Sequence, residues 1–305
     1  MNILVTGGMG FLGNELVRQL REKNYHVVSY DRRVKENNED PQLCYLQGDL
    51  SDLPLMLETL RAHQIDAVIH TAAISHPYFS REIPYQTVMT NAVGTTNVFE
   101  ACRLSNINRI INFSSECAYG NNADLGVVTE EASLEPTTPY GATKVFTEKL
   151  AAVYSNLYGM EIYSLRPGWI YGPGQFMQCY MKTLLRNAID DKPTIEERGS
   201  DYHFQYVHVS DVARAAFLAA TVPNLRYNVY NITGGNQISY TYLVSYVKEL
   251  FPEAEIKIGP GTIDVLDANA MFDISRANED LGYHPEVELK TGIRKYAQWL
   301  KDHPY

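Results

Sequence analysis

Cysteine is scarce in this sequence of 305 residues, and its four cysteines lie far apart. They are Cys44, Cys102, Cys117 and Cys179. No C-x-x-C pair occurs, so the spacing of a zinc site and that of a disulfide framework are both missing. His203 and His208 have no third ligand placed near them, and we therefore predict no metal site. Sparse, unpaired cysteines favour a reducing compartment, so we expect a cytoplasmic protein.

Long apolar runs and an excess of positive charge are also missing. No run of about 18 uncharged apolar residues offers a transmembrane helix, and the apolar N-terminus lacks the basic leader of a signal peptide. Lys and Arg number 26 against 36 Asp and Glu, which gives a net charge of −10. Such a balance does not suit the neutralisation of phosphates or anionic lipid, so we expect neither nucleic acid nor a membrane as partner.

Hydrophobic residues make up 45% of the chain, enough for one large domain or two small ones. Short β-rich apolar runs predict strands at 2–6, 26–30, 43–46, 66–70, 109–113 and 161–165. Apolar residues at helical spacing predict helices at 11–23, from 51 onward, at 84–104 and at 139–158. This alternation predicts an α/β fold, a Rossmann-type doubly wound parallel sheet covered by helices on both faces.

The alternating pattern ends after Arg166, where prolines and glycines crowd between 167 and 174. We predict that 1–166 plus about 205–231 form a Rossmann domain, and that about 167–204 and 232–305 form a smaller C-terminal α/β substrate-binding lobe. Residues 207–221 are expected to return to the main domain as strand, turn and helix. Further strands are expected at 229–231 and 255–258, and further helices at 240–250 and 291–300.

A glycine-rich turn joins the first predicted strand to the first predicted helix, with Gly7, Gly10 and Gly13 around Phe11 and Leu12. Glycines let the backbone approach a pyrophosphate, which the free N–H groups at a helix N-terminus bind. A glycine triplet alone also fits an ordinary turn. The strand before it, the helix after it and an acidic residue at the end of the second strand together predict a dinucleotide site.

That acidic residue is Asp31, whose carboxylate accepts hydrogen bonds from ribose hydroxyls and repels a 2′-phosphate. We therefore expect NAD as the cofactor. Arg32 and Arg33 leave NADP open, because a guanidinium can pair with that phosphate or stack on adenine. Asp49 and Leu50 follow the third strand, where they either flank the adenine or form a capped turn.

Tyr140 and Lys144 are four residues apart at the start of a predicted helix, on one face. A lysine cation and a positive nicotinamide both favour the phenolate of a neighbouring tyrosine. Tyr140 would then exchange a proton with a substrate hydroxyl while hydride moves to or from the nicotinamide. The same spacing occurs on many solvated helices, so this interpretation depends on the dinucleotide site that precedes it.

Five segments spread along the chain support a family resemblance. They are TGGMGFLG from Thr6, HTAA from His70, FSSECAYG from Phe113, YGATK from Tyr140 and RPGWIYGPG from Arg166. Together they resemble the extended short-chain dehydrogenases/reductases, and among them the NAD-dependent epimerase/dehydratase group that works on sugars and nucleotide sugars. The resemblance covers nearly the whole chain, and the joint spacing of five motifs is more specific than any one of them.

The resemblance implies roles for individual residues. Ser115 would hydrogen-bond the reacting oxygen, and Tyr140 would be the acid/base. Lys144 would hold the nicotinamide ribose and lower the pKa of the tyrosine. Ala72 and Ala73 would let the backbone pass close to the cofactor, with Asn91 on the following helix supporting it. The helices at 84–104 and 139–158 match those that the family pairs between subunits, which implies a homodimer.

Departures from the family pattern limit this assignment. Dehydratases of the group carry two acidic residues after the hydroxyl residue, where this chain has Glu116 and Cys117. A thiol is a poor substitute for a carboxyl group in water elimination, which disfavours dehydration. Glu116 is either an additional acid/base or a helix-capping carboxylate, with capping slightly favoured.

Two anchors for a nucleotide diphosphate are also altered. Trp169 replaces a common asparagine, and the usual arginine is missing around Phe204. Its possible replacements are Arg186, Arg198 and Arg214. Candidate substrate contacts are His76, Glu116, Trp169 and Phe204.

We therefore expect an NAD-dependent epimerase that transiently oxidises a secondary alcohol of a carbohydrate, most plausibly a nucleotide sugar. The first alternative is a net NAD(P)-dependent dehydrogenase or reductase on a free sugar, sugar acid or other small alcohol, which the two missing anchors favour. A non-catalytic NAD(H)-sensing protein is a distant third, because Tyr140 and Lys144 are both present.

Overall fold

A computed structural model describes residues 1–35 and 40–304 of the chain. Its centre is a parallel sheet of seven strands in the order β12-β7-β5-β4-β1-β2-β3. The strands are β1 (Asn2–Thr6), β2 (His26–Asp31), β3 (Leu43–Gln47), β4 (Ala67–His70), β5 (Arg109–Phe113), β7 (Glu161–Pro167) and β12 (Val229–Ile232). The predicted α/β class is confirmed. Because the strand order reverses between β1 and β4, a crevice is expected at their carboxyl ends.

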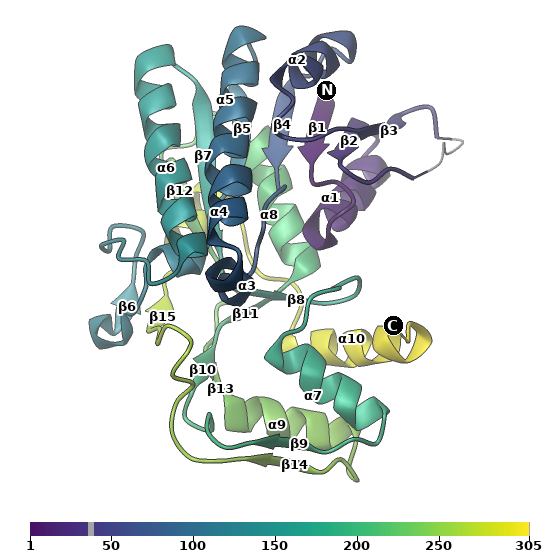
Figure 1. Ribbon diagram of the computed structural model, residues 1–305, viewed down its shortest axis with the longest axis vertical. Helices are drawn as coiled ribbons and strands as arrows, with labels where there is room; N and C mark the ends of the chain where they lie inside the picture. Colours follow the sequence, from purple (N-terminus) through teal and green to yellow (C-terminus); the bar gives the residue numbers. More distant parts are fainter. Residues whose placement is uncertain (36–39, 305) are drawn as a thin grey trace.

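Helices cover both faces of this sheet (Figure 1). One layer holds α1 (Phe11–Glu22) and α8 (Val209–Thr221), and the other holds α2 (Leu53–Ala62), α5 (Gly94–Leu104) and α6 (Pro139–Tyr158). Strand β1 shows why, since Ile3 and Val5 pack in the core that includes α1 and α8 while Leu4 packs in the other core. Successive side chains of a strand point to opposite faces, so a buried central strand is apolar throughout.

The predicted helix at 84–104 is a run of three parts: α4 (Pro84–Val88), a π-helical turn at Met89–Val93, and α5. The helices α3 (Pro77–Glu82) and α7 (Tyr180–Ile189) were not predicted. The last two helices are α9 (Tyr240–Leu250) and α10 (Leu289–Asp302). Short turns of 3₁₀ helix lie at Glu116–Ala118 and Ala123–Leu125, and a second π turn lies at Ala277–Leu281.

Outside the main sheet the strands form separate pairs. These are β8 (Trp169–Tyr171) with β11 (Tyr206–His208), β9 (Thr194–Glu196) with β14 (Ile256–Ile258), β10 (His203–Phe204) with β13 (Ile238–Ser239), and β6 (Val127–Val128) with β15 (Met271–Phe272). In Figure 1, α7, α9, α10 and the pairs β9–β14 and β10–β13 lie together below the sheet. An apolar core rich in tyrosine joins these elements.

Residues 207–221 were expected to return to the main domain as strand, turn and helix. Strand β11 pairs with β8 and not with the main sheet, but its Val207 lies in the core of the main domain, and α8, which begins at the next residue, packs on the same domain. Gly168 lets the two segments approach closely at this point, because a Cβ there would lie 2.5 Å from the carbonyl oxygen of Gln205. The chain leaves β7 at this close contact and starts a separate sheet. The proposed division of the chain into two domains stays a prediction.

Within the described residues no helix is long and apolar enough to cross a lipid bilayer. The cytoplasmic location stays a prediction.

A buried ion pair holds α6 against the sheet. The guanidinium of Arg166, at the end of β7, meets the carboxylate of Glu148 through Nη2–Oε2 at 2.6 Å and Nε–Oε1 at 2.8 Å. Both side chains are 4% exposed. The remaining guanidinium nitrogen donates to the hydroxyl of Tyr119 at 2.7 Å and to the carbonyl of Glu130 at 3.1 Å. Every face of this buried cation is therefore satisfied.

Replacing Glu148 by Gln should be strongly destabilising, because it leaves the Arg166 cation buried without its counter-ion. We expect a loss of about 3 kcal/mol in the free energy of unfolding, measured by urea denaturation. The control is Glu161→Gln, which breaks the pair with Arg109 at a carboxylate that is 47% exposed. That loss should stay below about 1 kcal/mol. Equal losses in the two variants would contradict this account.

Candidate active site

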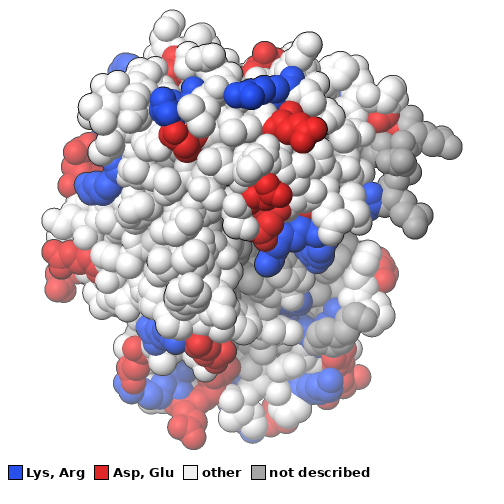
Figure 2. Space-filling view, turned by 45° about the horizontal axis from the view of Figure 1, so that its top comes forward, with Lys and Arg blue, Asp and Glu red and all other residues white. Residues whose placement is uncertain are grey.

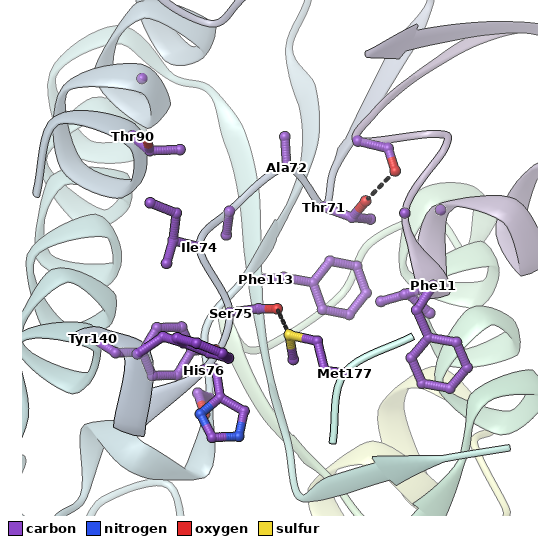
Figure 3. A pocket seen from close by; sticks show the side chains of 18 of the residues that line it. Phe11, Thr71, Ala72, Ile74, Ser75, His76, Thr90, Phe113, Tyr140 and Met177 are labelled. Atoms are coloured by element: carbon purple, nitrogen blue, oxygen red, sulfur yellow. Dashed lines mark hydrogen bonds between the residues drawn. The ribbon is translucent and has the colours of Figure 1, made fainter. Parts of the chain in front are cut away.

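A cavity of about 1040 Å³ opens at the carboxyl ends of the parallel strands, where the topology predicts a crevice. Its lining comes from the loops after β1, β2, β3, β4, β5 and β7 and from the segment before α7. Figure 3 shows Phe11 and Tyr140 on opposite sides of it, with Met177 between them. Most of the predicted site residues are therefore brought together at one cavity.

The glycine turn packs tightly at one end of the cavity. Gly7 has a φ of +70°, and a Cβ there would lie 2.7 Å from the backbone nitrogen of Ala72. A Cβ at Gly13 would lie 2.0 Å from the carbonyl oxygen of Gly7. Side chains at these two positions would push apart β1, β4 and α1. The sequence pattern is thus explained by backbone packing as well as by ligand approach.

The start of α1 fits a pyrophosphate. Gly10 is the residue before the helix, and no side chain caps the free N–H groups of the first turn. These groups face the cavity with Phe11 and Leu12 among its lining residues. Uncapped N–H groups and the positive end of the helix dipole favour an anion here. The residues present therefore fit the diphosphate of a dinucleotide.

Asp31 faces the glycine turn from the end of β2. Its carboxylate accepts the backbone N–H of Met9 at 3.1 Å and that of Arg33 at 3.0 Å. The guanidinium of Arg33 donates to the carbonyl of Met9 at 3.0 Å. Arg32 and Arg33 both line the cavity beside this carboxylate. This grouping marks the end of the cavity that suits an adenosine ribose.

Asp49 and Leu50 also line the cavity. The carboxylate of Asp49 accepts the backbone N–H and the hydroxyl of Ser51 at 2.8 and 2.7 Å. These bonds lower the pKa of Asp49 and make the capped turn that was one of the two expectations for this residue. Leu50 packs against Gly94 of α5, where a Cβ would lie 2.9 Å from its side chain.

Ala72 and Ala73 line the cavity after β4. Asn91 does not line it, which corrects its place among the cofactor contacts. Its amide accepts the N–H of Ile74 at 2.8 Å, and donates to the carbonyl of Ile74 at 3.0 Å and to the hydroxyl of Thr143 at 3.1 Å. Asn91 therefore fixes the loop after β4 without lining the cavity itself. The π turn at Met89–Val93 contains Asn91 and places its amide beside that loop.

The three predicted catalytic side chains lie together where β5 ends and α6 begins. Ser115 follows β5 and is 7% exposed, and Tyr140 is in the first turn of α6, which Thr138 caps through a 3.0 Å bond from the N–H of Gly141. Lys144 donates to the carbonyl of Phe113 at 2.5 Å and lies 5.5 Å from the ring centroid of Tyr140. All three line the cavity.

Burial dominates the acid/base properties of this group. It raises the pKa of Tyr140 above its ordinary value, the nearby Cys117 and Glu116 raise it further, and a hydrogen bond with Ser115 acts in the opposite direction. Lys144 bonds the backbone carbonyl of Phe113, and the lowering of the tyrosine pKa by Lys144 stays a prediction. Burial lowers the pKa of Lys144 itself to about 8, although the charge of Glu148 favours the ammonium.

Glu116 is buried at the cavity, with 7% of its surface exposed. Its Oε2 has no hydrogen-bond partner, and burial, followed by the charge of Asp267, raises its pKa well above the ordinary value. The capping interpretation is wrong, because the Ser115 hydroxyl accepts the capping bond from the N–H of Cys117 at 3.2 Å. Burial therefore disfavours the charged form of Glu116, and its Oε2 has no partner.

Of the other candidate substrate contacts, His76 and Trp169 line the cavity and Phe204 does not. His76 lines the cavity, and its Nδ1 accepts the N–H of Tyr78 at 3.1 Å at the start of α3. Trp169 lines the cavity too. Phe204 does not, because it is completely buried behind Trp169, with ring centroids 5.3 Å apart and planes at 88°. Its predicted substrate contact is wrong, since the indole separates it from the cavity.

Sequence reasoning missed the segment at 175–179 and the residues around Ser75, which form much of the remaining lining. The hydroxyl of Ser75 lies 3.9 Å from the sulfur of Met177, so the two loops meet across the cavity (Figure 3). The crowded glycines up to Gly174 were the available signal for a loop there. Among the described residues no cluster of His, Cys, Asp and Glu is arranged to hold a metal ion.

The sheet order and the glycine turn define a Rossmann-type dinucleotide-binding protein. Comparison with known proteins gives the family: residues 3–233 match the model of the NAD dependent epimerase/dehydratase family, and the chain belongs to that family. It is an enzyme family that depends on NAD, so the expected cofactor is confirmed.

The relatives include both reactions of that family. A putative UDP-glucose 4-epimerase of Methanocaldococcus jannaschii is 31% identical over 98% of each chain. The dTDP-glucose 4,6-dehydratase 1 of Escherichia coli is 27% identical over 98% of this chain and 92% of its own. Among solved structures, the Thermotoga maritima UDP-glucose 4-epimerase with UDP-glucose is 27% identical with a TM-score of 0.89, and MoeE5 with UDP-glucose and NAD is 29% identical with a TM-score of 0.89. Each covers 99% of both chains.

The buried ammonium of Lys144 makes stability depend on pH. Because its pKa falls from 10.5 to about 8 on folding, the charged form destabilises the folded protein fully below pH 8. The penalty fades as the pH rises from about 8 to 10.5, because Lys144 is then neutral in the folded protein and the proton that folding removes from the unfolded chain costs less to release at higher pH. Lys144→Met should therefore raise the free energy of unfolding at pH 7 by about 2 kcal/mol, after allowing for the lost hydrogen bond.

This gain should shrink between pH 8 and pH 10 in urea denaturation experiments, and turnover should be lost at every pH. The control is Lys149→Met, which changes an exposed lysine on the same helix and should alter stability at neither pH. A Lys144→Met variant less stable than the parent at pH 7, or a gain independent of pH, would contradict the assigned burial cost.

Proposed function

We propose that this protein is an NAD-dependent epimerase that inverts a secondary alcohol of a carbohydrate. The alcohol is oxidised to a ketone, which is then reduced from its opposite face. The observation that carries this proposal is the convergence of Ser115, Tyr140 and Lys144 on a cavity whose other end holds the glycine turn. A substrate hydroxyl between Ser115 and Tyr140 would face both a hydrogen-bonding group and a proton carrier.

The chain's own residues handle the proton and the oxygen. NAD, when bound, would supply the acceptor and donor of hydride. Ser115 would hydrogen-bond the reacting oxygen, and Tyr140 would take the hydroxyl proton during oxidation and return it during reduction. The raised pKa of Tyr140 suits the return of the proton to the ketone oxygen. Its role as base requires a positive charge close to the phenol to offset burial.

Epimerisation is favoured over dehydration by the residues that follow Ser115. Burial raises the pKa of the Cys117 thiol to about 12, so this side chain is a weak acid and rarely a thiolate. Elimination of water needs both a base and an acid near the sugar, and Glu116 alone supplies one carboxyl group. The named epimerases act on or bind nucleotide sugars, which supports that class as the first to test.

A net dehydrogenase or reductase is the second candidate. Among the described residues, those that line the cavity around Trp169 include no Lys or Arg, which favours a substrate smaller and less charged than a nucleotide sugar. A protein that only senses NAD(H) remains the third, and the presence of both Tyr140 and Lys144 in the cavity argues against it.

The test follows product configuration by NMR together with NADH absorbance on a panel of nucleotide sugars, free sugars and glycosides. We expect an epimer without net NADH, and a loss of turnover of at least 10²-fold in Tyr140→Phe with NAD affinity retained. Tyr158→Phe removes an exposed hydroxyl from the same helix and is the control. Sustained NADH release without an epimer would favour the second candidate. Full turnover by Tyr140→Phe would refute the acid/base role.

We also propose a homodimer formed through α4, α5 and α6. Large apolar side chains are exposed along this surface, among them Tyr85 at 72%, Leu157 at 69% and Phe146 at 45%. Phe146, Val153 and Leu157 recur at helical spacing and form one stripe on α6. An exposed apolar surface of this kind is typical of an interface between subunits.

Sedimentation at micromolar concentration should give twice the mass of the chain, and Leu157→Glu should shift it to the monomer by placing charge in the interface. Leu125→Glu is the control, because Leu125 is 56% exposed but lies outside these helices. A monomeric parent protein would contradict the proposal.

A further inference from the structure

We call one part of the cavity the substrate end, and it is lined by Ser75, His76, Glu116, Cys117, Trp169 and residues 175–179. Some polar side chains there already have partners within the protein. The amide of Gln175 donates to the carbonyl of Ile170 at 3.1 Å, and its oxygen accepts the hydroxyl of Tyr296 at 3.0 Å. Nδ1 of His76 accepts the N–H of Tyr78 at 3.1 Å. The hydrogen bonds of these groups hold the protein itself together.

The carboxyl group of Glu116 differs from them. This side chain is 7% exposed, and its Oε2 is buried without a hydrogen-bond partner. Acidic side chains on the surface lie among cations: on the face shown in Figure 2, Asp and Glu are interleaved with Lys and Arg. Burial raises the pKa of Glu116, and the charge that adds to this effect comes from another acidic residue, Asp267. A buried polar atom without a partner lowers stability, so it calls for a functional explanation.

Gly168 lies beside this unpartnered oxygen. A Cβ at Gly168 would lie 3.5 Å from Oε2 of Glu116 and 2.5 Å from the carbonyl oxygen of Gln205. The close approach of Gln205 requires glycine here, and as a result no side chain covers the carboxyl group from this position. Gly168 and Glu116 both line the cavity. A ligand in the substrate end can therefore reach the carboxyl group.

Glu116 also lies close to the groups that handle the proton. It follows Ser115 directly in the chain, and its charge adds to burial and to Cys117 in raising the pKa of Tyr140. In the proposed reaction, the oxygen of the oxidised alcohol lies between Ser115 and Tyr140. A side chain next to Ser115 is then placed to reach a second substituent of the same sugar ring.

A hydroxyl is the substituent that suits this carboxyl group. The protonated form of Glu116, which burial favours, donates a hydrogen bond and also accepts one. A sugar hydroxyl does the same, so the two groups can satisfy each other. A sugar ammonium group would require the carboxylate, which burial disfavours, and an apolar substituent would leave Oε2 without a partner.

We infer that Glu116 is a specificity-determining residue, whose carboxyl group hydrogen-bonds a second hydroxyl of a nucleotide-sugar substrate, beside the hydroxyl that is oxidised. The inference rests on the proposed function and deepens it. A sugar that lacks this hydroxyl would leave the carboxyl group unpaired in the complex, so the site should discriminate against it.

Calorimetric titration of the NAD-loaded protein with UDP-glucose and its 2-deoxy, 3-deoxy and 6-deoxy analogues tests this inference. We expect one analogue to bind at least about tenfold more weakly than UDP-glucose. In Glu116→Leu this ratio should fall below about threefold, because the variant cannot bond the hydroxyl in either case. Glu116→Gln should keep the ratio, since an amide also donates and accepts. A ratio that is the same in the parent protein and in Glu116→Leu would overturn the inference, as would a failure of UDP-glucose to bind.

Urea denaturation separates this role from a structural one. Glu116→Leu removes a buried oxygen without a partner, so its denaturation midpoint should lie above that of the parent protein. The control is Glu130→Leu, because Glu130 is 8% exposed, does not line the cavity and accepts the N–H of Asn231 at 2.8 Å. Its midpoint should fall. A lower midpoint in Glu116→Leu would indicate a structural role and overturn the inference. If Glu116→Leu does not fold, Glu116→Ala gives the same comparison of ligands, and failure of both to fold would also overturn it.

Ser114 provides a second control at the site. Among the described lining residues, its hydroxyl oxygen is also buried without a partner. Ser114→Ala should leave the ratio between UDP-glucose and the deoxy analogue unchanged. Loss of the ratio in Ser114→Ala, with the ratio kept in Glu116→Leu, would assign the hydroxyl contact to Ser114 and overturn the inference.

The titrations measure binding alone, so they are independent of the proposed function. A ratio that depends on Glu116, without any epimer formed from UDP-glucose, supports the contact and contradicts the proposed function. Formation of an epimer, with a ratio that does not depend on Glu116, overturns the contact and leaves the proposed function standing.

Discussion

The ion pair between Arg166 and Glu148 fixes the helix on which the active site depends. Tyr140, Lys144 and Glu148 recur every four residues on one face of α6, so anchoring the last of them sets the positions of the other two. Arg166 lies at the end of β7, just before the chain leaves the main sheet for the strands that carry Trp169. One buried contact therefore aligns the catalytic helix with the segment that closes the substrate end.

Several buried titratable groups in the site reduce the stability of the folded protein. Burial opposes the charged forms of Tyr140, Lys144 and Glu116, and Oε2 of Glu116 has no hydrogen-bond partner. A core chosen for stability alone would hold apolar residues at these positions. Groups buried with perturbed pKa values are characteristic of sites that bind ligands and move protons. All three of these groups line the cavity at the strand ends.

Local sequence patterns predicted the sheet strands, the glycine turn and the Tyr-Lys pair, because each depends on residues close together in the chain. Partners distant in sequence were not predictable. Strand β11 pairs with β8, Gly168 packs on Gln205, Phe204 lies behind Trp169, and Asn91 bonds the loop at Ile74. Helix α7 was not predicted, although its apolar residues at 181, 184, 185 and 188 are spaced as in a helix and are buried. The glycines before it favoured a loop.

Transient oxidation at Tyr140 is the central claim, and the fate of one hydrogen tests it most directly. A substrate is labelled with deuterium at the carbon that is inverted and converted in ordinary water. If hydride leaves that carbon and returns to it within one binding event, the epimer retains the deuterium, as mass spectrometry would show. Replacement of the deuterium by solvent hydrogen would mean that the carbon loses a proton instead, and would contradict the account.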